Sequence, residues 1–391
     1  MRSLLVAVTA AAALAQSSGT AAADDGADFL ADAKLFYRLV ACGGSEPLPP
    51  TVDAPTVEAH CAVMAKRYRH YAEKYAAAAR AFFAPLRPAT LPEAVVYPFG
   101  GGDLGSAVIT FPDAREITTI SLEHAGDPTR LAKLDKRRLR AALAAYRDAS
   151  EGLLSLHDST SENMRKLERG GIPGQLSFHI TGLAALGYEP VALRFIKLGP
   201  DGVVHHLTAA EIAALAPKTA KKVKGGWVDT DFSEAFNDME LTFRKAGDAK
   251  APLIVHRHFA ANLANQAFKD SPLYKHLLAK GKFAAMTKAA SYLLWSDSFS
   301  AIRDLLLGNM VWMASDSTGI PPRFAKKAGF QQITYGRFTA PFLEEANVAT
   351  GEAMAKLWSS QPPRKLPFRY GYPDANLSVH LMITQPAEAK P

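Results

Sequence analysis

The pattern of apolar positions is sharpest between Ala94 and Glu123. Val95–Tyr97 is a short apolar run, which is typical of a buried strand. Glycines end this run, a helical pattern begins at Asp103, and Ile117–Leu122 is a second strand pattern. A strand, turn, helix and strand within roughly thirty residues predict one right-handed βαβ crossover.

The glycines of this unit follow the spacing G-x-G-x-x-G. They are Gly100, Gly102 and Gly105, with Gly101 between the first two. Glu123 follows Gly105 by 18 residues, so the layout is that of a dinucleotide-binding turn with an acid for ribose hydroxyls. Two interpretations stay open. Asp103 would repel a phosphate at the helix start, and it would equally serve as a helix cap beside a purely structural turn.

Helical spacing recurs along much of the chain. Helices are predicted at Asp28–Leu39, Val57–Ala84, Lys136–Leu156, Ser159–Glu168, Gln175–Leu186, Thr208–Leu215 and Ser300–Leu307. Thr208 with Glu211 predicts a capping box, and Gly187 is suited to a helix C-terminus. Ala285–Trp295 fits a strand and a helix equally well.

Antiparallel hairpins are predicted around two turns. The strand pairs are Val191–Leu198 with Val203–His206, and Phe236–Arg244 with Leu253–His258. Met310–Ala314 is an apolar strand, and the Pro-rich C-terminal part is expected to be irregular, ending in a strand at Leu377–Ile383. The fold class that follows is α/β, with a Rossmann-like, mostly parallel sheet flanked by helices and an antiparallel hairpin. We expect residues 24–90 to form an N-terminal helical extension and 91–391 a single α/β domain.

The first 23 residues have the layout of a secretory signal. Arg2 precedes the apolar stretch Leu4–Ala15, and small residues up to Ala23 offer a cleavage site. This predicts export to the periplasm or the cell exterior. No later apolar run reaches the ~18 residues of a membrane span.

The net charge of the 391-residue chain is only +7. Its basic runs are not interleaved with aromatic residues, which argues against nucleic acid as a partner. Peripheral attraction to an anionic envelope surface remains open.

Two cysteines, Cys42 and Cys61, lie close together in the chain. In an exported protein they most simply form a disulfide. The alternative is a lipid on Cys42, because Leu39–Cys42 has the form of a lipobox.

The segment VVYPFGGGDLGSAVITFPDAREITTISLE, with ACGG before it and DSTGIPPRF after it, resembles a family of uncharacterised secreted bacterial proteins. That resemblance implies no activity. The order of elements also resembles class I methyltransferases, which implies Gly100 and Gly102 beneath a cofactor and Glu123 on its ribose. The chain departs from this family at Pro98, where such enzymes place an acid.

Three polar groups are expected at the carboxyl ends of the strands, where open α/β sheets bind ligands. They are Gly100–Asp103, Glu123–His124 and Asp316–Ser317–Thr318. Together they could carry out acid–base chemistry or hold a cation. The alternative is that the acids only cap turns or face solvent.

His256 and His258 share one face of a predicted strand, a spacing that suits Zn²⁺, with Asp229 and Asp231 as further ligands. No third ligand stands at a firm spacing, so an exposed hairpin face is the favoured interpretation. His205 and His206 point to opposite faces. The chain contains neither a G-x-S-x-G elbow nor a phosphate-binding P-loop.

The sequence therefore predicts an exported protein that binds a small ligand in the crevice between Gly100 and Glu123. The sequence names no cofactor and no reaction. One alternative is a methyltransferase-like or metal-assisted enzyme. Another is a non-catalytic envelope or partner-binding protein on a degenerate Rossmann scaffold.

Overall fold

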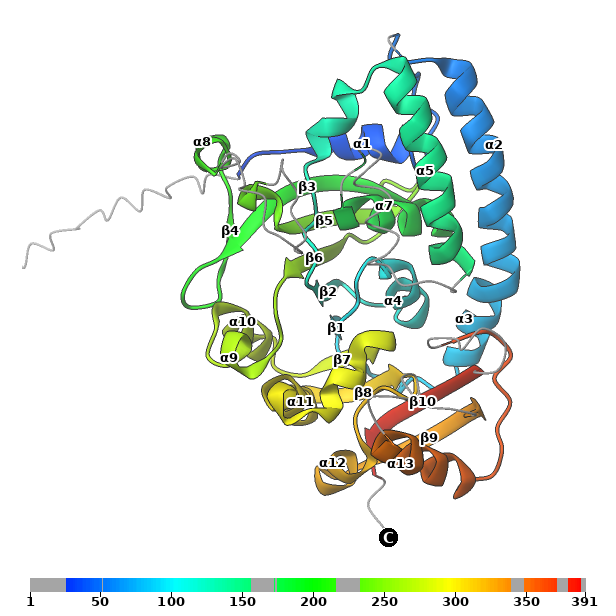
Figure 1. Cartoon of the computed structure of the whole chain (residues 1–391), viewed down its shortest axis with the longest axis vertical. Coiled ribbons are helices and arrows are strands. Elements are labelled where there is room, and N and C mark those ends of the chain that lie inside the picture. The colour runs from blue at the N-terminus through cyan, green and yellow to red at the C-terminus, as the bar shows by residue number, and fades with distance from the viewer. Residues whose placement is uncertain are drawn as a thin grey trace, which may run out of the picture.

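The protein has an α/β fold, in which one continuous sheet carries helices on both faces (Figure 1). The computed structural model describes residues 26–50, 52–155, 172, 174–215, 233–338, 348–370 and 379–387. The α/β class expected from the sequence is thus confirmed. The first 23 residues and the helix predicted at Ser159–Glu168 lie outside the described residues.

The described residues form a ten-stranded sheet in the order β4-β3-β5-β6-β2-β1-β7-β8-β10-β9. In chain order the strands are β1 (Ala94–Pro98), β2 (Glu116–Ser121), β3 (Tyr188–Leu198), β4 (Val204–His206), β5 (Asp238–Lys245), β6 (Ile254–Ala260), β7 (Phe283–Thr287), β8 (Met310–Ser315), β9 (Phe330–Arg337) and β10 (Val379–Pro386).

The five central strands, from β6 to β8, run parallel. The outer strands are antiparallel to their neighbours, so four of the nine adjacent pairs in the described sheet are parallel and five antiparallel. The expectation of a mostly parallel sheet is therefore wrong. The antiparallel pairs β3–β4 and β5–β6 are hairpins at one end of the sheet, and at the other end β10 lies antiparallel between β8 and β9.

The βαβ unit expected around the glycines is confirmed. Helix α4 (Leu104–Thr110) joins β1 to β2, which pair in parallel from Ala94 opposite Glu116 to Pro98 opposite Ile120. Both predicted hairpins are present as β3–β4 and β5–β6.

The remaining helices cover the two faces of the sheet. They are α1 (Leu30–Leu39), α2 (Ala54–Tyr71), α3 (Ala77–Phe83), α5 (Lys136–Ser155), α7 (Gly174–Leu186), α8 (Ala209–Ala214), α9 (Asn265–Phe268), α10 (Pro272–Ala279), α11 (Ser300–Asn309), α12 (Pro322–Lys327) and α13 (Val348–Ser359). The capping box of α8 is present, as predicted from Thr208 and Glu211. The ambiguous segment divides into β7 and a 3₁₀ helix, Ala289–Trp295.

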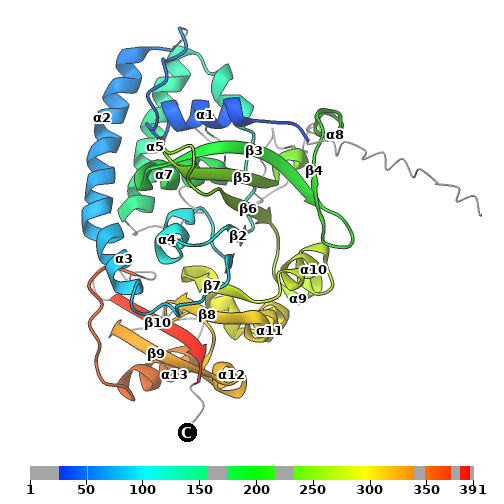
Figure 2. The ribbon, with the colours of Figure 1, turned by 180° about the vertical axis from the view of Figure 1, so that it is seen from behind.

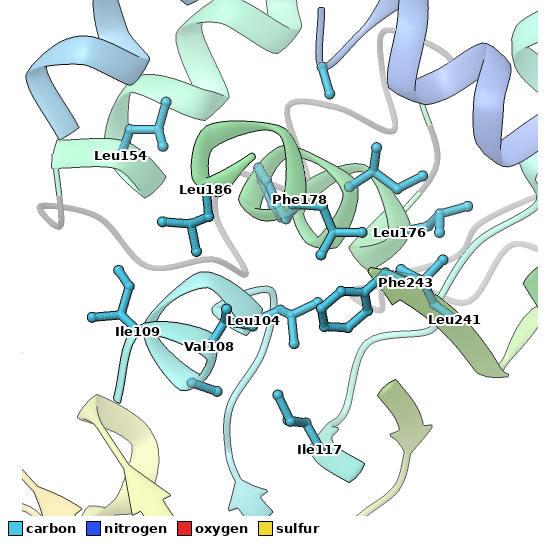
Figure 3. Close-up of a cluster of buried hydrophobic side chains, with 14 of the residues drawn as sticks. Leu104, Val108, Ile109, Ile117, Leu154, Leu176, Phe178, Leu186, Leu241 and Phe243 are labelled. Atoms are coloured by element: carbon cyan, nitrogen blue, oxygen red, sulfur yellow. The ribbon is translucent and has the colours of Figure 1, made fainter. Parts of the chain in front are cut away.

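Successive side chains along a strand point to opposite faces of the sheet, so they contribute to two separate hydrophobic cores. Val95 and Tyr97 of β1 face a core shared with α1 to α5 and α7, whereas Val96 faces a core shared with α9 to α12. Figure 3 shows part of the first core, where side chains of α4 lie against α7. Figures 1 and 2 show α2 running alongside α5 at the outside of this core.

The long helix predicted at Val57–Ala84 is present but contains one π-helical turn, Ala72–Ala76, between α2 and α3. π turns often occur at functional sites because they redirect side chains. The predicted disulfide between Cys42 and Cys61 is also present. It ties the segment after α1 to α2, and a paired Cys42 has no thiol left for a lipid.

The C-terminal part is more regular than the sequence indicated. It contains α12, β9 and α13, and β10 pairs with β9 along its whole length, from Val379 to Pro386. The expectation of an irregular region before one strand is therefore wrong. β9 was missed because Gln331 and Gln332 place polar side chains on both of its faces.

Candidate functional site

The turn after β1 is built to let helix α7 come close. The chain turns through positive φ angles at Phe99 (60°) and Gly101 (49°). A Cβ on Gly102 would lie 2.7 Å from the Cβ of Phe178 on α7, which is too close for any other residue. The close neighbour of this glycine is therefore an aromatic side chain of the protein itself.

The other two glycines of the pattern also have packing partners. A Cβ on Gly105 would approach the Tyr71 hydroxyl at 3.2 Å and the Cα of Gly182 at 3.7 Å, and one on Gly100 would meet Tyr97. These contacts support the structural interpretation of the turn, in which the glycines let α7 and α2 pack close to it.

Asp103 has two roles in the structure. It caps α4 by accepting a hydrogen bond from the Ser106 backbone N–H (3.3 Å). Its other carboxylate oxygen, Oδ2, pairs with the Nζ of Lys288 at 2.7 Å. Lys288 directly follows β7, so the ion pair joins the carboxyl ends of β1 and β7. The two side chains are only 15% and 11% exposed, so the pair is largely removed from water.

Hydroxyl groups surround this ion pair. Tyr97 donates to Asp103 Oδ2 at 3.1 Å, and Lys288 donates to Ser106 Oγ at 3.1 Å. Tyr75, from the π turn, hydrogen bonds to the same serine oxygen at 3.1 Å. The ring of Tyr370 lies 5.2 Å from Lys288 Nζ, and its buried hydroxyl has no hydrogen-bond partner in the part of the chain that the structure describes.

The ionisation states make this cluster a set of hydrogen-bond donors. Burial lowers the pKa of Lys288, but the Asp103 carboxylate and its other neighbours outweigh that effect and hold the pKa above its usual value. Burial raises the pKa of Tyr97 and Tyr370 well above the ordinary phenol value. At neutral pH the cluster therefore presents a charged ammonium and neutral phenols.

Asp316 and Ser317 follow β8 at the same edge of the sheet. Asp316 accepts hydrogen bonds from the backbone and side chain of Thr318. Its charge raises the pKa of Lys288 and opposes the lowering of the His380 pKa by burial. Asp103 and Asp316 thus both act on Lys288.

Glu123 is placed differently from these two acids. Gln175, at the start of α7, donates from Nε2 to Ser121 Oγ (2.6 Å) and to Glu123 Oε2 (3.3 Å). The backbone carbonyl of Glu123 lies 2.8 Å from Nε2 of His258. Glu123 is therefore held at the end of β2 by α7 and β6.

His256 and His258 do share one face of β6, but that face is fully buried, so the expectation of an exposed hairpin face is wrong. α7 covers it and adds His179, whose ring centroid lies 4.4 Å from that of His256. Thr119 Oγ1 lies 2.8 Å from His256 Nε2 and 3.0 Å from His258 Nδ1. Among the described residues, no group of three or more His, Cys, Asp or Glu side chains is arranged to hold a metal ion.

The other polar residues considered from the sequence have separate places. His205 and His206 pair with different acids, Glu211 and Glu240, as expected for opposite faces of a strand. Asp229 and Asp231 lie outside the described residues.

Sequence analysis did not identify Lys288, Tyr370, His380 or His179. The position of Lys288, directly after a buried strand that ends at Thr287, was the signal that could have found it. The ambiguity of Ala285–Trp295 concealed that signal.

No family model, curated protein or solved structure matches this chain. None of the described helices is long and apolar enough to cross a membrane.

Proposed function

We propose that the protein is an exported, Rossmann-like protein that binds a small polar ligand at the carboxyl ends of β1 and β7. This lies within the crevice expected between Gly100 and Glu123, centred on Asp103. Taken in chain order, the five parallel strands β1, β2, β6, β7 and β8 lie in the spatial order 3-2-1-4-5. The strand order reverses between β1 and β7, and doubly wound sheets bind ligands at such a switch point.

The observation that carries the proposal is the ion pair between Asp103 and Lys288 at this point. Removing two charges from water costs several kcal/mol, which their attraction rarely returns in full. Such costly groups gather where binding or chemistry needs them. The unpartnered hydroxyl of Tyr370 beside the pair adds a donor for a ligand.

The test is an unbiased mass-spectrometric search for small molecules released when the purified protein is denatured. Wild type should release a compound that Lys288→Met does not, because the methionine keeps the volume and loses the ammonium. The matched control is Lys280→Met, which removes another buried lysine, one that pairs with Glu116 at the amino end of β2. Identical compounds from all three proteins would contradict the proposal.

The charge of the ligand can be read from Asp103→Asn. Removing the carboxylate should tighten binding of an anion, because repulsion falls and Lys288 is freed. Binding of a cation should weaken. Either result can be measured by titration calorimetry with the compound that the search identifies.

A methyltransferase-like enzyme is the second candidate. It is supported by the order of the parallel strands and by β10, which lies antiparallel between β8 and β9. Phe178 against Gly102 and Pro98 in place of the acid weigh against a cofactor in the turn. Equilibrium dialysis with S-adenosylmethionine tests it, and absence of binding would leave the small-ligand or the partner-binding alternative.

A further inference from the structure

A second reactive arrangement lies one strand further along the sheet. Ser317 follows β8, and His380 lies on β10, the antiparallel neighbour of β8. Ser317 Oγ is 2.9 Å from His380 Nε2, the distance of a hydrogen bond between a nucleophile and its base. Both residues are buried, at 4% and 3% exposed. The two residues are 63 apart in sequence, one in the loop after β8 and the other on β10, so the pairing is a product of the tertiary fold.

We propose that Ser317 and His380 form a nucleophile–base dyad that hydrolyses esters. This goes beyond the ligand-binding proposal and does not rest on it. It adds a reaction class at a different pair of residues.

The surroundings of His380 suit a base. The rings of Phe338 and Trp358 lie 5.8 and 5.9 Å from the imidazole and fix its plane. Burial lowers the pKa of His380, although Asp316 opposes this, so the imidazole is neutral at pH 7. Its Nδ1 is buried with no hydrogen-bond partner in the described part of the chain. With the ring proton on Nδ1, Nε2 is free to accept the serine proton. Among the described residues no side chain hydrogen bonds to Nδ1, so the arrangement is a dyad rather than a triad.

The reaction balances with water as the only co-reactant. Ser317 Oγ bonds to the acyl carbon while His380 Nε2 takes the hydroxyl proton and passes it to the departing alcohol oxygen. Water then gives a proton to Nε2, and its oxygen bonds to the acyl carbon. The proton returns to Ser317 Oγ as the acyl–serine bond breaks, which releases the carboxylic acid.

A fluorophosphonate probe tests the dyad without a known substrate. The serine oxygen bonds to phosphorus, fluoride leaves, and the proton goes to the histidine. We expect intact-mass spectrometry of the folded, full-length protein to show one added phosphonyl group, mapped to Ser317 by peptide sequencing. No labelling of the folded wild type, or labelling at another serine, would overturn the proposal.

Variants separate catalysis from folding. Ser317→Ala should abolish labelling, and His380→Gln should slow it by at least about 100-fold while keeping a hydrogen bond to the serine. Ser291→Ala is the matched control, because this buried serine pairs with Thr318 rather than with a histidine. Circular dichroism should report the same fold for all three. Equal labelling rates in wild type and folded His380→Gln would overturn the role of the base.

Discussion

Gly102 sets the distance between the turn after β1 and helix α7. Any side chain there must displace Phe178, whose Cβ would be 2.7 Å away. We expect Gly102→Val to lower the free energy of unfolding by about 1–3 kcal/mol, the usual cost of overpacking. Urea denaturation measures this. Gly308→Ala is the control, since nothing lies within 4 Å of its added Cβ. If Gly102→Val unfolds at the urea concentration of wild type, the turn does not depend on this contact.

Asp103 is a residue whose importance the sequence understates. Asn caps a helix about as well as Asp, so Asp103→Asn looks mild from the sequence. The structure adds Lys288, whose buried ammonium would lose its counter-charge. We therefore expect Asp103→Asn to cost about 3 kcal/mol. In a double-mutant cycle with Lys288→Met, the second change should restore part of that loss. Additive effects in urea denaturation would show that the two groups act independently.

At the scale of elements, helices, strands and turns can be predicted from the sequence wherever the pattern that marks them lies within a few residues. The βαβ unit, both hairpins and the capping box of α8 follow from side-chain periodicity, turn residues and caps, all read within a few residues. The strand β9 was missed because Gln331 and Gln332 interrupt its apolar pattern, although Ile333 and Tyr335 pack against the core. The prediction that the β6 histidines are exposed was wrong for another reason. The helix that buries them, α7, comes from a distant part of the chain.

The packing of α7 on β6 makes the protein sensitive to acid. Burial lowers the pKa of His258 to about 4 and those of His179 and His256 well below the usual value. The unfolded chain takes up these protons near pH 6.5 while the folded protein does not. The contribution of these histidines to the free energy of unfolding is therefore fully present above about pH 6.5 and is lost as the pH drops towards 4. His258 alone should account for about 3 kcal/mol of that fall, at about 1.4 kcal/mol per pKa unit.

Urea denaturation between pH 7.5 and 4.5 measures this loss. His258→Gln should flatten the pH dependence. Stability of wild type that is constant over this range would contradict the argument.

At the scale of the whole molecule, the candidate site depends on the order of strands, which no local pattern encodes. Asp103 and Asp316 were expected at one edge of the sheet, and the structure places both where they act on Lys288. Glu123 instead accepts a hydrogen bond from Gln175 of α7, which lies next to the end of β2. The sequence thus indicates which polar residues follow strands, whereas which of them contact one another depends on the tertiary fold.

The disulfide between Cys42 and Cys61 links the N-terminal helices, which share a core with the sheet. The bond closes a loop with a sequence separation of 19, for which chain entropy predicts about 3 kcal/mol of stabilisation. We expect Cys42→Ser with Cys61→Ser to lower the free energy of unfolding by that amount, and dithiothreitol to destabilise wild type but not the double variant. Protein from the native host should begin near Asp24 and carry no free thiol after denaturation, as expected for an exported chain. Two free thiols would indicate a reducing compartment, and a chain that begins at Met1 would show that no signal is removed; either result would contradict the prediction of export.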